Sequence, residues 1–283
     1  MSKKTVSRLS VPPARDYARQ AHAGDPSGQI TPGMLYGVGV GPGSPDLLTL
    51  RAINVLRSVR VILAASSPGN DYSLALSIAS PHLPEDVEVI RLDFPMTRDR
   101  AVLEASWNAN AEIVADVLDS GRDAAFLTLG DPLIYSTFGY LMRTLHERRP
   151  SLPVSIVPGI TSYQEAAAKT RTILCEGGEN LLLIPGINNA DTLGRALDVA
   201  DSAIILKAYR NFGVIRDVLR QKNRSESCLF ASRLGLDNEI TIRGLEKAPE
   251  NPHYLSLVLT PPDRPHPAAT PSTPCKDTSC PQK

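Results

Sequence analysis

The chain has 283 residues, of which 42% are hydrophobic and 21% charged, so it is long enough to bury a large core. Its 30 basic and 30 acidic residues cancel, and no net field would attract nucleic acid or a membrane surface. No segment reaches the roughly 18 apolar residues of a membrane helix, and no apolar run follows Lys3 and Lys4 as in a secretory signal. The four cysteines form no C-x-x-C pair. Free thiols are typical of a reducing cytoplasm, where we expect the protein to act without nucleic-acid or membrane partners.

The two ends of the chain differ in composition from the middle. Residues 1–33 contain five Lys or Arg and four Pro, which is typical of a flexible N-terminal arm. Residues 261–283 contain seven Pro among 23 residues, which predicts a disordered Pro-rich tail. The length between them predicts two domains. Because Arg148–Ser151 precedes a new apolar run, we expect the domains to comprise residues 34–150 and 151–260.

Short apolar runs alternate with helical patterns through both expected domains, which favours α/β architecture with largely parallel strands. The expected strands are Leu35–Val40, Val59–Leu63, Val87–Leu92, Ala124–Leu129, Val154–Val157, Asn180–Ile184, Ala203–Leu206, Ser227–Ala231 and Tyr254–Leu259. The expected helices lie near 45–57, 72–80, 99–119, 136–148, 162–169, 191–199 and 213–221.

The first apolar run leads into a glycine-rich turn, YGVGVGPGSPDLLTL, at residues 36–50. Its glycines lack a Cβ and allow a ligand or another segment to approach the backbone. Ser44 suits a helix N-cap and Pro45 the first helical position. The dinucleotide fingerprint G-x-G-x-x-G fails, and no lysine follows as in a phosphate P-loop. Taken alone, this turn fits a ligand-binding loop and a plain α/β connection equally well.

Two further turns follow apolar strands. The first, TLGDPLIYSTFGY, occupies Thr128–Tyr140, and the second, VPGITS, occupies Val157–Ser162. Ligands of open α/β sheets bind at the carboxyl ends of strands, where these turns are expected. A capped helix start is the alternative reading of each turn alone.

The order GPGxPxLLT, GDPLxYST and VPGITS resembles the tetrapyrrole methylases, which use S-adenosylmethionine. The resemblance spans roughly residues 34–260. It implies two α/β domains, each a mixed, mostly parallel sheet with flanking helices, and an active site in the interdomain cleft. The first domain would form the tetrapyrrole side and the second the methyl-donor side, usually within a homodimer.

Within this family the chain is most similar to the transferases that methylate C20 of precorrin-2 or cobalt-factor II in cobalamin biosynthesis, a branch of porphyrin-type biosynthesis. The supporting residues are YSTFGYL, the Phe94–Met96 stretch FPM, and Trp107. The alternatives are a methylase of the same fold acting on another tetrapyrrole position, or on protein or RNA, and a non-catalytic tetrapyrrole- or nucleotide-binding protein.

The resemblance carries the family's binding residues onto positions of this sequence. The implied methyl-donor contacts are Pro42, Leu129, Gly130, Asp131, Ile134, Thr161, Ser162, Pro185, Phe230 and Ala231. The tetrapyrrole contacts we expect are Gly41, Gly43, Ser44, Lys207, Arg210 and Arg233.

Methyl transfer from a sulfonium requires alignment and exclusion of water rather than a protein nucleophile. A proton must leave the attacking carbon, and Tyr36, Asp46 and Tyr135 are the candidate acceptors. Many family members have an acidic residue where this chain has Ser44, so that residue cannot supply an acid here. The five histidines are scattered without zinc-ligand spacing. We therefore expect no protein-bound metal, and any cobalt would arrive in the substrate.

Overall fold

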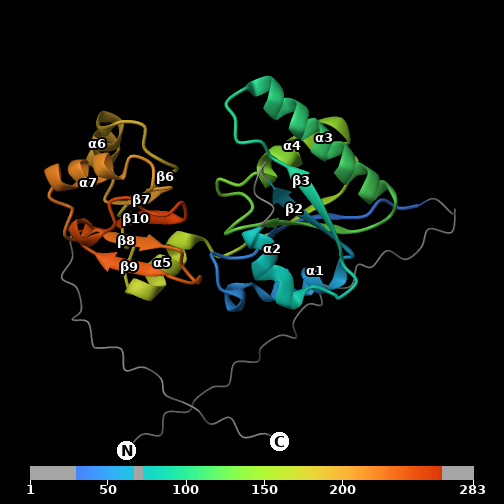
Figure 1. Cartoon of the computed structure of the whole chain (residues 1–283), viewed down its shortest axis with the longest axis horizontal. Helices are drawn as coiled ribbons and strands as arrows, with labels where there is room; N and C mark the ends of the chain where they lie inside the picture. The colour runs from blue at the N-terminus through green and yellow to red at the C-terminus, as the bar shows by residue number, and fades with distance from the viewer. Residues whose placement is uncertain (1–29, 67–72, 263–283) are drawn as a thin grey trace, which may run out of the picture. The chain divides into compact units, whose positions relative to one another are not determined.

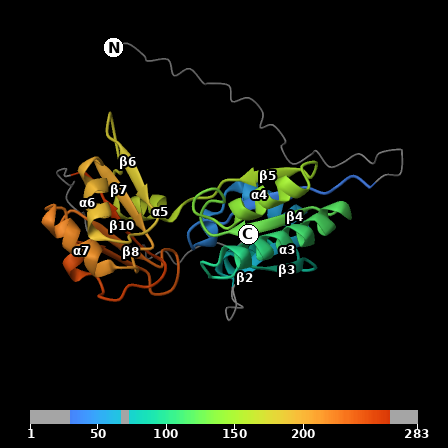
Figure 2. The ribbon, with the colours of Figure 1, turned by 90° about the horizontal axis from the view of Figure 1, so that it is seen from above.

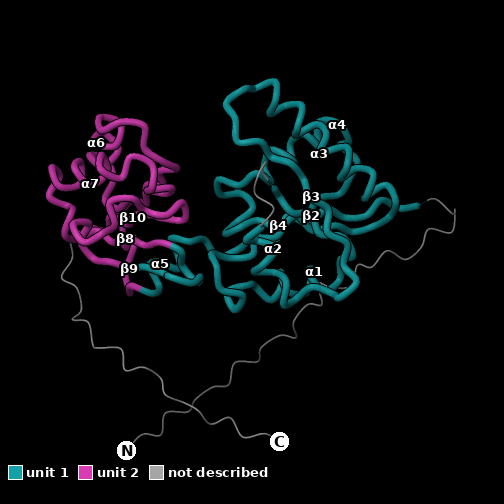
Figure 3. Tube along the Cα trace, in the orientation of Figure 1, with its two compact units in different colours: residues 1–169, 233–240 teal, residues 170–232, 241–283 magenta. Residues whose placement is uncertain are grey.

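The structure, a computed structural model, describes residues 30–66 and 73–262. The expected arm (1–33) and tail (261–283) therefore lie almost entirely outside the described residues. The chain divides into two compact units (Figure 3). Unit 1 comprises the chain up to Lys169 together with Arg233–Ile240, and unit 2 comprises Thr170–Ser232 and the chain from Thr241 onward.

Unit 1 contains a five-stranded sheet in the order β3-β2-β4-β1-β5, and all of its paired strands are parallel. Strands β2, β3, β4 and β5 are labelled in Figure 2. Because every pair is parallel, the carboxyl ends of all five strands lie at the same end of the sheet. The strands are β1 (Leu35–Gly39), β2 (Val61–Ser66), β3 (Glu88–Asp93), β4 (Ala124–Thr128) and β5 (Val154–Val157).

The expected boundary after residue 150 is not where the structure divides. Strand β5 pairs with β1 from Leu35↔Val154 to Val38↔Val157 and so completes the first sheet. Unit 1 then continues to Lys169. The Arg148–Ser151 stretch is the turn between a helix and β5, and such a turn has the same composition as a domain linker.

Helices cover both faces of the first sheet. Its helical elements are η1 (Pro45–Leu47), α1 (Leu50–Ser58), α2 (Leu74–Ala79), η2 (Ser80–His82), α3 (Arg100–Asp119), α4 (Phe138–Arg148) and α5 (Ser162–Thr170), where η denotes a 3₁₀ helix. Successive strand residues point to opposite faces. Leu35 and Phe126 pack with α3 and α4 on one face, and Val38 and Ala125 pack with α1 and α2 on the other.

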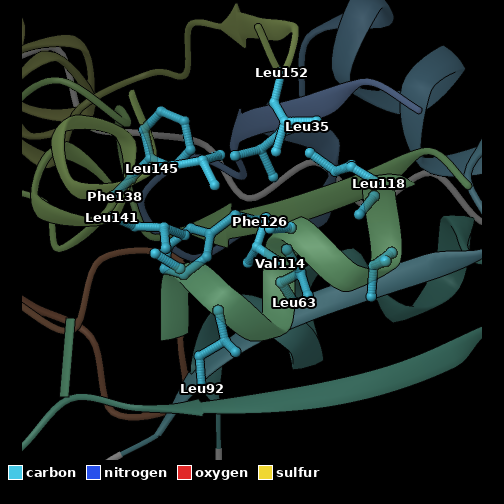
Figure 4. Packing of buried hydrophobic residues seen from close by; sticks show 14 of the residues in the cluster. Leu35, Leu63, Leu92, Val114, Leu118, Phe126, Phe138, Leu141, Leu145 and Leu152 are labelled. Carbon is cyan, nitrogen blue, oxygen red and sulfur yellow. The ribbon is translucent and has the colours of Figure 1, made fainter. Parts of the chain in front are cut away.

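Figure 4 shows the first of these cores, in which Phe126 of β4 lies among Val114 of α3 and Phe138 and Leu141 of α4. Phe126 and Phe138 are fully buried, and their ring centroids lie 5.6 Å apart. Burying each such side chain contributes roughly 1.5–3 kcal/mol. This packing fixes where α4 starts, and with it the end of the loop after β4.

The helix expected at 45–57 is two elements. Pro45–Leu47 form a single 3₁₀ turn, after which Leu48 and Thr49 are extended. The cap of α1 is Thr49, whose side chain accepts a hydrogen bond from the Ala52 amide at 3.1 Å. Ser44 makes no side-chain capping bond.

Unit 2 contains a second five-stranded sheet, in the order β6-β7-β10-β8-β9 (Figure 1). Strands β6 and β7 are parallel, whereas β10 is antiparallel to both β7 and β8. This sheet is therefore mixed, with fewer parallel pairs than expected. Its strands are β6 (Leu181–Ile184), β7 (Ser202–Leu206), β8 (Leu229–Ser232), β9 (Ile240–Arg243) and β10 (Ser256–Thr260), accompanied by α6 (Ala190–Asp198), α7 (Phe212–Gln221) and η3 (Leu245–Lys247).

Strand β9 was not expected from the sequence. Its sequence is ITIR, in which Thr241 and Arg243 are exposed. Only Ile240 and Ile242 are large and apolar. It lies at the edge of the sheet, where short and charged strands are common.

Within the described residues, none of the helices combines the length and the apolar character needed to cross a membrane.

Candidate functional site

The three turns singled out in the sequence lie side by side in unit 1. They follow β4, β1 and β5, which are neighbours in the sheet and run parallel. Their carboxyl ends therefore meet at one edge. The expectation that these three turns form one site depends on this adjacency, and the structure provides it.

Three glycines bring the turns into backbone contact. A Cβ on Gly39 would lie 2.5 Å from the Gly130 carbonyl oxygen and 2.6 Å from the Gly159 nitrogen. A Cβ on Gly159 would lie 2.1 Å from the same Gly130 oxygen. Since no real side chain tolerates such distances, positions 39 and 159 require glycine. We call Gly39, Gly130 and Gly159 the glycine junction.

Hydrogen bonds fasten the glycine junction. The Gly130 amide donates to the Gly41 carbonyl at 2.8 Å, which ties the loop after β4 to the loop after β1. The Asp131 carboxylate accepts from the Gly159 amide at 3.1 Å and from the Leu133 amide at 2.9 Å. Asp131, expected as a donor contact, thus has a structural role in joining the loops after β4 and β5.

The glycine-rich turn after β1 is packed against the protein itself. A Cβ on Gly43 would lie 2.0 Å from the Leu234 carbonyl oxygen. Gly235, the next residue, has φ +70°, and a Cβ there would lie 2.5 Å from the Ser44 nitrogen. Gly41, Pro42 and Gly43 are all buried. The close approach that the glycines allow is therefore made by the Arg233–Ile240 segment.

Ser44 contacts the other candidate side chain of this turn. Its hydroxyl donates a hydrogen bond to a carboxylate oxygen of Asp46, which is exposed. The Ser44 hydroxyl thus orients the carboxylate two residues later.

The loop after β4 presents apolar side chains to solvent. Leu133, Ile134 and Tyr135 are exposed by 56%, 37% and 52%. Tyr135 has a left-handed backbone with φ 50°, which is rare for a bulky residue and is found at functional turns. Ser136 anchors the end of the loop, since its hydroxyl accepts from the Phe138 amide at 3.0 Å and lies 3.2 Å from the Thr128 hydroxyl.

Thr161 and Ser162 lie at the start of α5, after the loop from β5. The Thr161 amide and hydroxyl both donate to the Gln164 side-chain oxygen, each at 2.9 Å. Thr161 is buried and Ser162 half-buried. The first amides of a helix lack intrahelical partners, and Gln164 satisfies one of them here.

Tyr36 is not part of this group. It lies near the start of β1, paired with Ala125 and Ser155, at the amino edge of the sheet. Burial and the nearby Asp123 carboxylate raise the pKa of Tyr36, an effect that Arg51 partly opposes. The structure thus places Tyr36 at the opposite end of β1 from the three turns.

In unit 2 the expected residues gather at the edge where β6, β7 and β8 end. Pro185 follows β6, and Lys207 and Arg210 lie in the loop after β7. The Asn211 side chain, from a residue with φ 55°, donates to the Ile187 carbonyl at 2.8 Å and so joins these two loops.

Phe230 and Ala231 are in the body of β8 and are 0% and 1% exposed. The Phe230 ring packs against Phe212 of α7 at 5.5 Å between centroids. Their side chains belong to the core of unit 2.

The comparisons with known proteins agree with this arrangement. A family model described as Tetrapyrrole (Corrin/Porphyrin) Methylases matches residues 34–249. A Salmonella typhimurium protein named cobalt-precorrin-2 C(20)-methyltransferase is 32% identical over 232 residues, covering 80% of this chain and 96% of that protein. The chain belongs to the tetrapyrrole methylase family. A Sinorhizobium protein named precorrin-2 C(20)-methyltransferase is 33% identical over 240 residues, covering 81% of this chain and 95% of that protein.

The tetrapyrrole methylase fold is also found in solved structures. The uroporphyrin-III C-methyltransferase of Thermus thermophilus, solved with S-adenosyl homocysteine, superposes with a TM-score of 0.57 at 20% identity. The match covers 81% of this chain and 92% of that chain. At this identity the likeness establishes the shared fold.

Two aromatic residues of this methylase near the candidate positions were missed from the sequence. Tyr209, beside Arg210, and Tyr254, before β10, have ring centroids 5.2 Å apart. The Arg210 guanidinium lies 5.5 Å from the Tyr209 ring centroid, and its Nε donates to the Tyr209 hydroxyl at 2.7 Å. The two tyrosines are 45 positions apart, and only the antiparallel pairing of β10 with β7 brings them together.

Trp107, Arg100 and Cys228 each have a structural role or setting outside the three turns. Trp107 packs against the core and stacks on Tyr140, with ring centroids 4.6 Å apart and an interplanar angle of 7°. Arg100 pairs with Glu104 on the exposed face of α3. Burial raises the pKa of the Cys228 thiol to about 12, so it stays protonated and is not a nucleophile. Among the described residues, no three His, Cys, Asp or Glu side chains are grouped as a metal site.

Proposed function

We propose that this tetrapyrrole methylase transfers a methyl group from S-adenosylmethionine to C20 of precorrin-2 or of its cobalt-containing counterpart. The observation that carries the proposal is the glycine junction, which holds the three family turns together at one sheet edge. The choice of C20 is supported by the names of two relatives whose sequences align with this chain over 96% and 95% of their length.

The donor contacts that we propose in unit 1 are compatible with a bound S-adenosylmethionine. Gly130 has φ +73°, and the nearest described atom to a Cβ there is the Thr161 Cα at 4.0 Å. The backbone between Gly130 and Thr161 is therefore open to a ligand, in contrast to Gly39 and Gly159. Leu129 and Ser162 adjoin these positions in the sequence, and Pro42 follows Gly41, whose carbonyl accepts from the Gly130 amide. The Ile134 amide donates to the Asp131 carbonyl, and Asp131 itself would act by holding the loops. In unit 2 we assign donor contacts to Pro185 and to the backbone of Phe230 and Ala231.

The donor, when bound, supplies an electrophilic methyl group on a sulfonium. The chain's own task is to hold C20 in line with that group and to keep water away. As the new carbon–carbon bond forms and the carbon–sulfur bond breaks, C20 must lose its proton. Asp46, oriented by Ser44, and Tyr135 remain the candidate acceptors.

The carboxylate arms of the tetrapyrrole require cations, and we assign that role to Lys207, Arg210 and Arg233. Arg233 has φ 56°, and its Nε has no hydrogen-bond partner among the described residues. A buried guanidinium nitrogen without a partner is costly, and a substrate carboxylate would satisfy it. Gly41, Gly43 and Ser44 would contact the substrate through their backbone.

The deciding experiment incubates the purified protein with S-adenosylmethionine labelled with ¹³C in the methyl group and with precorrin-2, free of metal or loaded with cobalt. We expect release of S-adenosyl homocysteine and a single methylated product. Carbon NMR of that product places the label on C20 if the proposal holds. Label on another carbon, or tetrapyrrole binding without S-adenosyl homocysteine, would refute it.

We also propose that the protein is a cytoplasmic homodimer that holds no metal of its own. Light scattering on the eluted protein should give twice the mass of the chain. Elemental analysis of the purified protein should find no stoichiometric metal.

A further inference from the structure

The Arg233–Ile240 segment connects β8 to β9 but packs in unit 1. Its contact there is the glycine-rich turn. The Leu234 carbonyl lies against Gly43, and Gly235 lies against the Ser44 amide, so closely that neither glycine could carry a Cβ. The conformation of the Gly41–Ser44 turn therefore depends on where this segment lies.

One carboxylate holds the segment in place. An oxygen of Glu239 accepts from the Gly235 amide at 2.6 Å and from the Lys169 ammonium at 2.5 Å. The segment is thereby closed on itself and tied to the last turn of α5. Left-handed backbone at Arg233 and Asn238 shows that it is tightly bent at both ends.

Lys169 is fixed in turn by a second carboxylate. Glu165, one turn earlier on α5, lies 3.4 Å from the ammonium, and its side chain is only 11% exposed. Lys169 and Glu239 are 36% and 24% exposed, so water screens this group less than an ion pair on the open surface. The three side chains form a cluster of two carboxylates and one ammonium beside the turn.

We propose that Glu239, held by Lys169, is a positioning residue that fixes the Gly41–Ser44 turn for tetrapyrrole binding through the Leu234–Gly235 contact. This inference rests on the proposed function, which assigns the turn to the substrate. Glu239 does not itself touch substrate.

The test compares the variants Glu239→Ala, Glu239→Gln and Lys169→Met. Glu239→Ala removes both hydrogen bonds, and Glu239→Gln keeps a neutral acceptor. Lys169→Met removes the counter-charge and its hydrogen bond but leaves the bond from the Gly235 amide. Glu112→Gln is the matched control, because Glu112 pairs with Arg148 on α3 and α4, away from the turn. Steady-state kinetics give KM for the tetrapyrrole, KM for the donor, and kcat. Hydrogen–deuterium exchange of the amides in 41–48 gives an independent readout.

We expect Glu239→Ala to raise KM for the tetrapyrrole at least about fivefold, the loss of one or two hydrogen bonds, with kcat changed less than about twofold. Glu239→Gln and Lys169→Met should give smaller rises in the same parameter, and Glu112→Gln none. Exchange in 41–48 should accelerate in the same order. If Glu239→Ala does not fold, the two milder variants decide the matter.

The proposal is overturned if these variants lower the melting temperature but leave KM for the tetrapyrrole and exchange in 41–48 as in the wild type. If the wild type methylates no tetrapyrrole, the proposed function fails. The exchange measurement then still decides whether Glu239 positions the turn.

Discussion

The Gly159 amide donates a 3.1 Å hydrogen bond to the Asp131 carboxylate, and this bond links the loop after β5 to the loop after β4. The other oxygen of the same carboxylate accepts from the Leu133 amide within its own loop. A single side chain therefore sets both the shape of one loop and its distance from the next.

Replacing Asp131 should consequently affect catalysis through loop position. We expect Asp131→Ala to lower kcat/KM for the methyl donor at least about tenfold, because hydrogen bonds to a charged group contribute roughly 1.5–3 kcal/mol each. Asp131→Asn should have a kcat/KM between those of the wild type and Asp131→Ala, since its side-chain amide keeps one acceptor oxygen. Steady-state kinetics at saturating tetrapyrrole check this, and an Asp131→Ala enzyme with wild-type kcat/KM would contradict it.

A methyl group added to the glycine junction should destabilise unit 1. In Gly159→Ala the new Cβ would lie 2.1 Å from the Gly130 carbonyl, and relieving that overlap should cost more than about 2 kcal/mol. Gly194→Ala in α6 is the control, because a Cβ there meets no described atom within 4 Å. Alanine in a helix interior stabilises by about 0.5–1 kcal/mol relative to glycine. Urea unfolding measures the free energy of unfolding of both variants. Equal values for Gly159→Ala and Gly194→Ala would disprove the packing argument.

Removing the phenol of Tyr36 should leave methyl transfer unchanged. Tyr36 is five residues from Gly41 along an extended strand, which places it roughly 16 Å from the turn. We expect Tyr36→Phe to keep kcat within about twofold of wild type. Tyr135→Phe should lower kcat if Tyr135 accepts the proton, and single-turnover rates distinguish the two. A large loss in Tyr36→Phe would require a site at the amino edge.

The Lys169–Glu239 pair should make stability depend on pH at both extremes. Burial alone would raise the pKa of Glu239, but the hydrogen bonds from Lys169 and the Gly235 amide outweigh it and lower the pKa below the ordinary 4.5. Its stabilisation is therefore present above that value and lost as pH falls through the lowered pKa. Burial likewise opposes the raised pKa of Lys169, whose ordinary value is 10.5, while Glu239 raises it. That contribution is present below 10.5 and lost as pH rises through the raised pKa.

We expect Glu239→Gln to reduce the free energy of unfolding near neutral pH and to flatten its decline in acid. Urea unfolding followed from pH 7 down to the acid range measures both effects. Parallel pH profiles for wild type and variant would show that the pair does not contribute.

Much of the fold could be predicted because its local patterns were unambiguous. The alternation of apolar runs and amphipathic helices located nine of the described strands, and the order of three turns indicated the family. The second sheet was harder, since antiparallel β10 and parallel β7 have equally apolar sequences. The edge strand β9 lacks that apolar pattern altogether.

The candidate site was predictable where function depends on sequence-local turns, and less so where it depends on packing. Tyr36 was included because it is close to the turn in sequence, although the structure places it at the opposite end of β1. The partner of Gly43 could not be inferred, since Leu234 is nearly 200 positions away. The pair Tyr209 and Tyr254 was missed for the same reason.

Because Arg233–Ile240 belongs to unit 1, that unit is built from two stretches separated by the whole of Thr170–Ser232. During synthesis the first sheet is complete once β5 has emerged, but Gly43 then still lacks Leu234, and Lys169 lacks Glu239. The glycine-rich turn acquires its final neighbours only after most of unit 2 has been made. Cutting the gene after residue 169 would therefore yield a sheet with an unfinished site rather than an independent half of the enzyme.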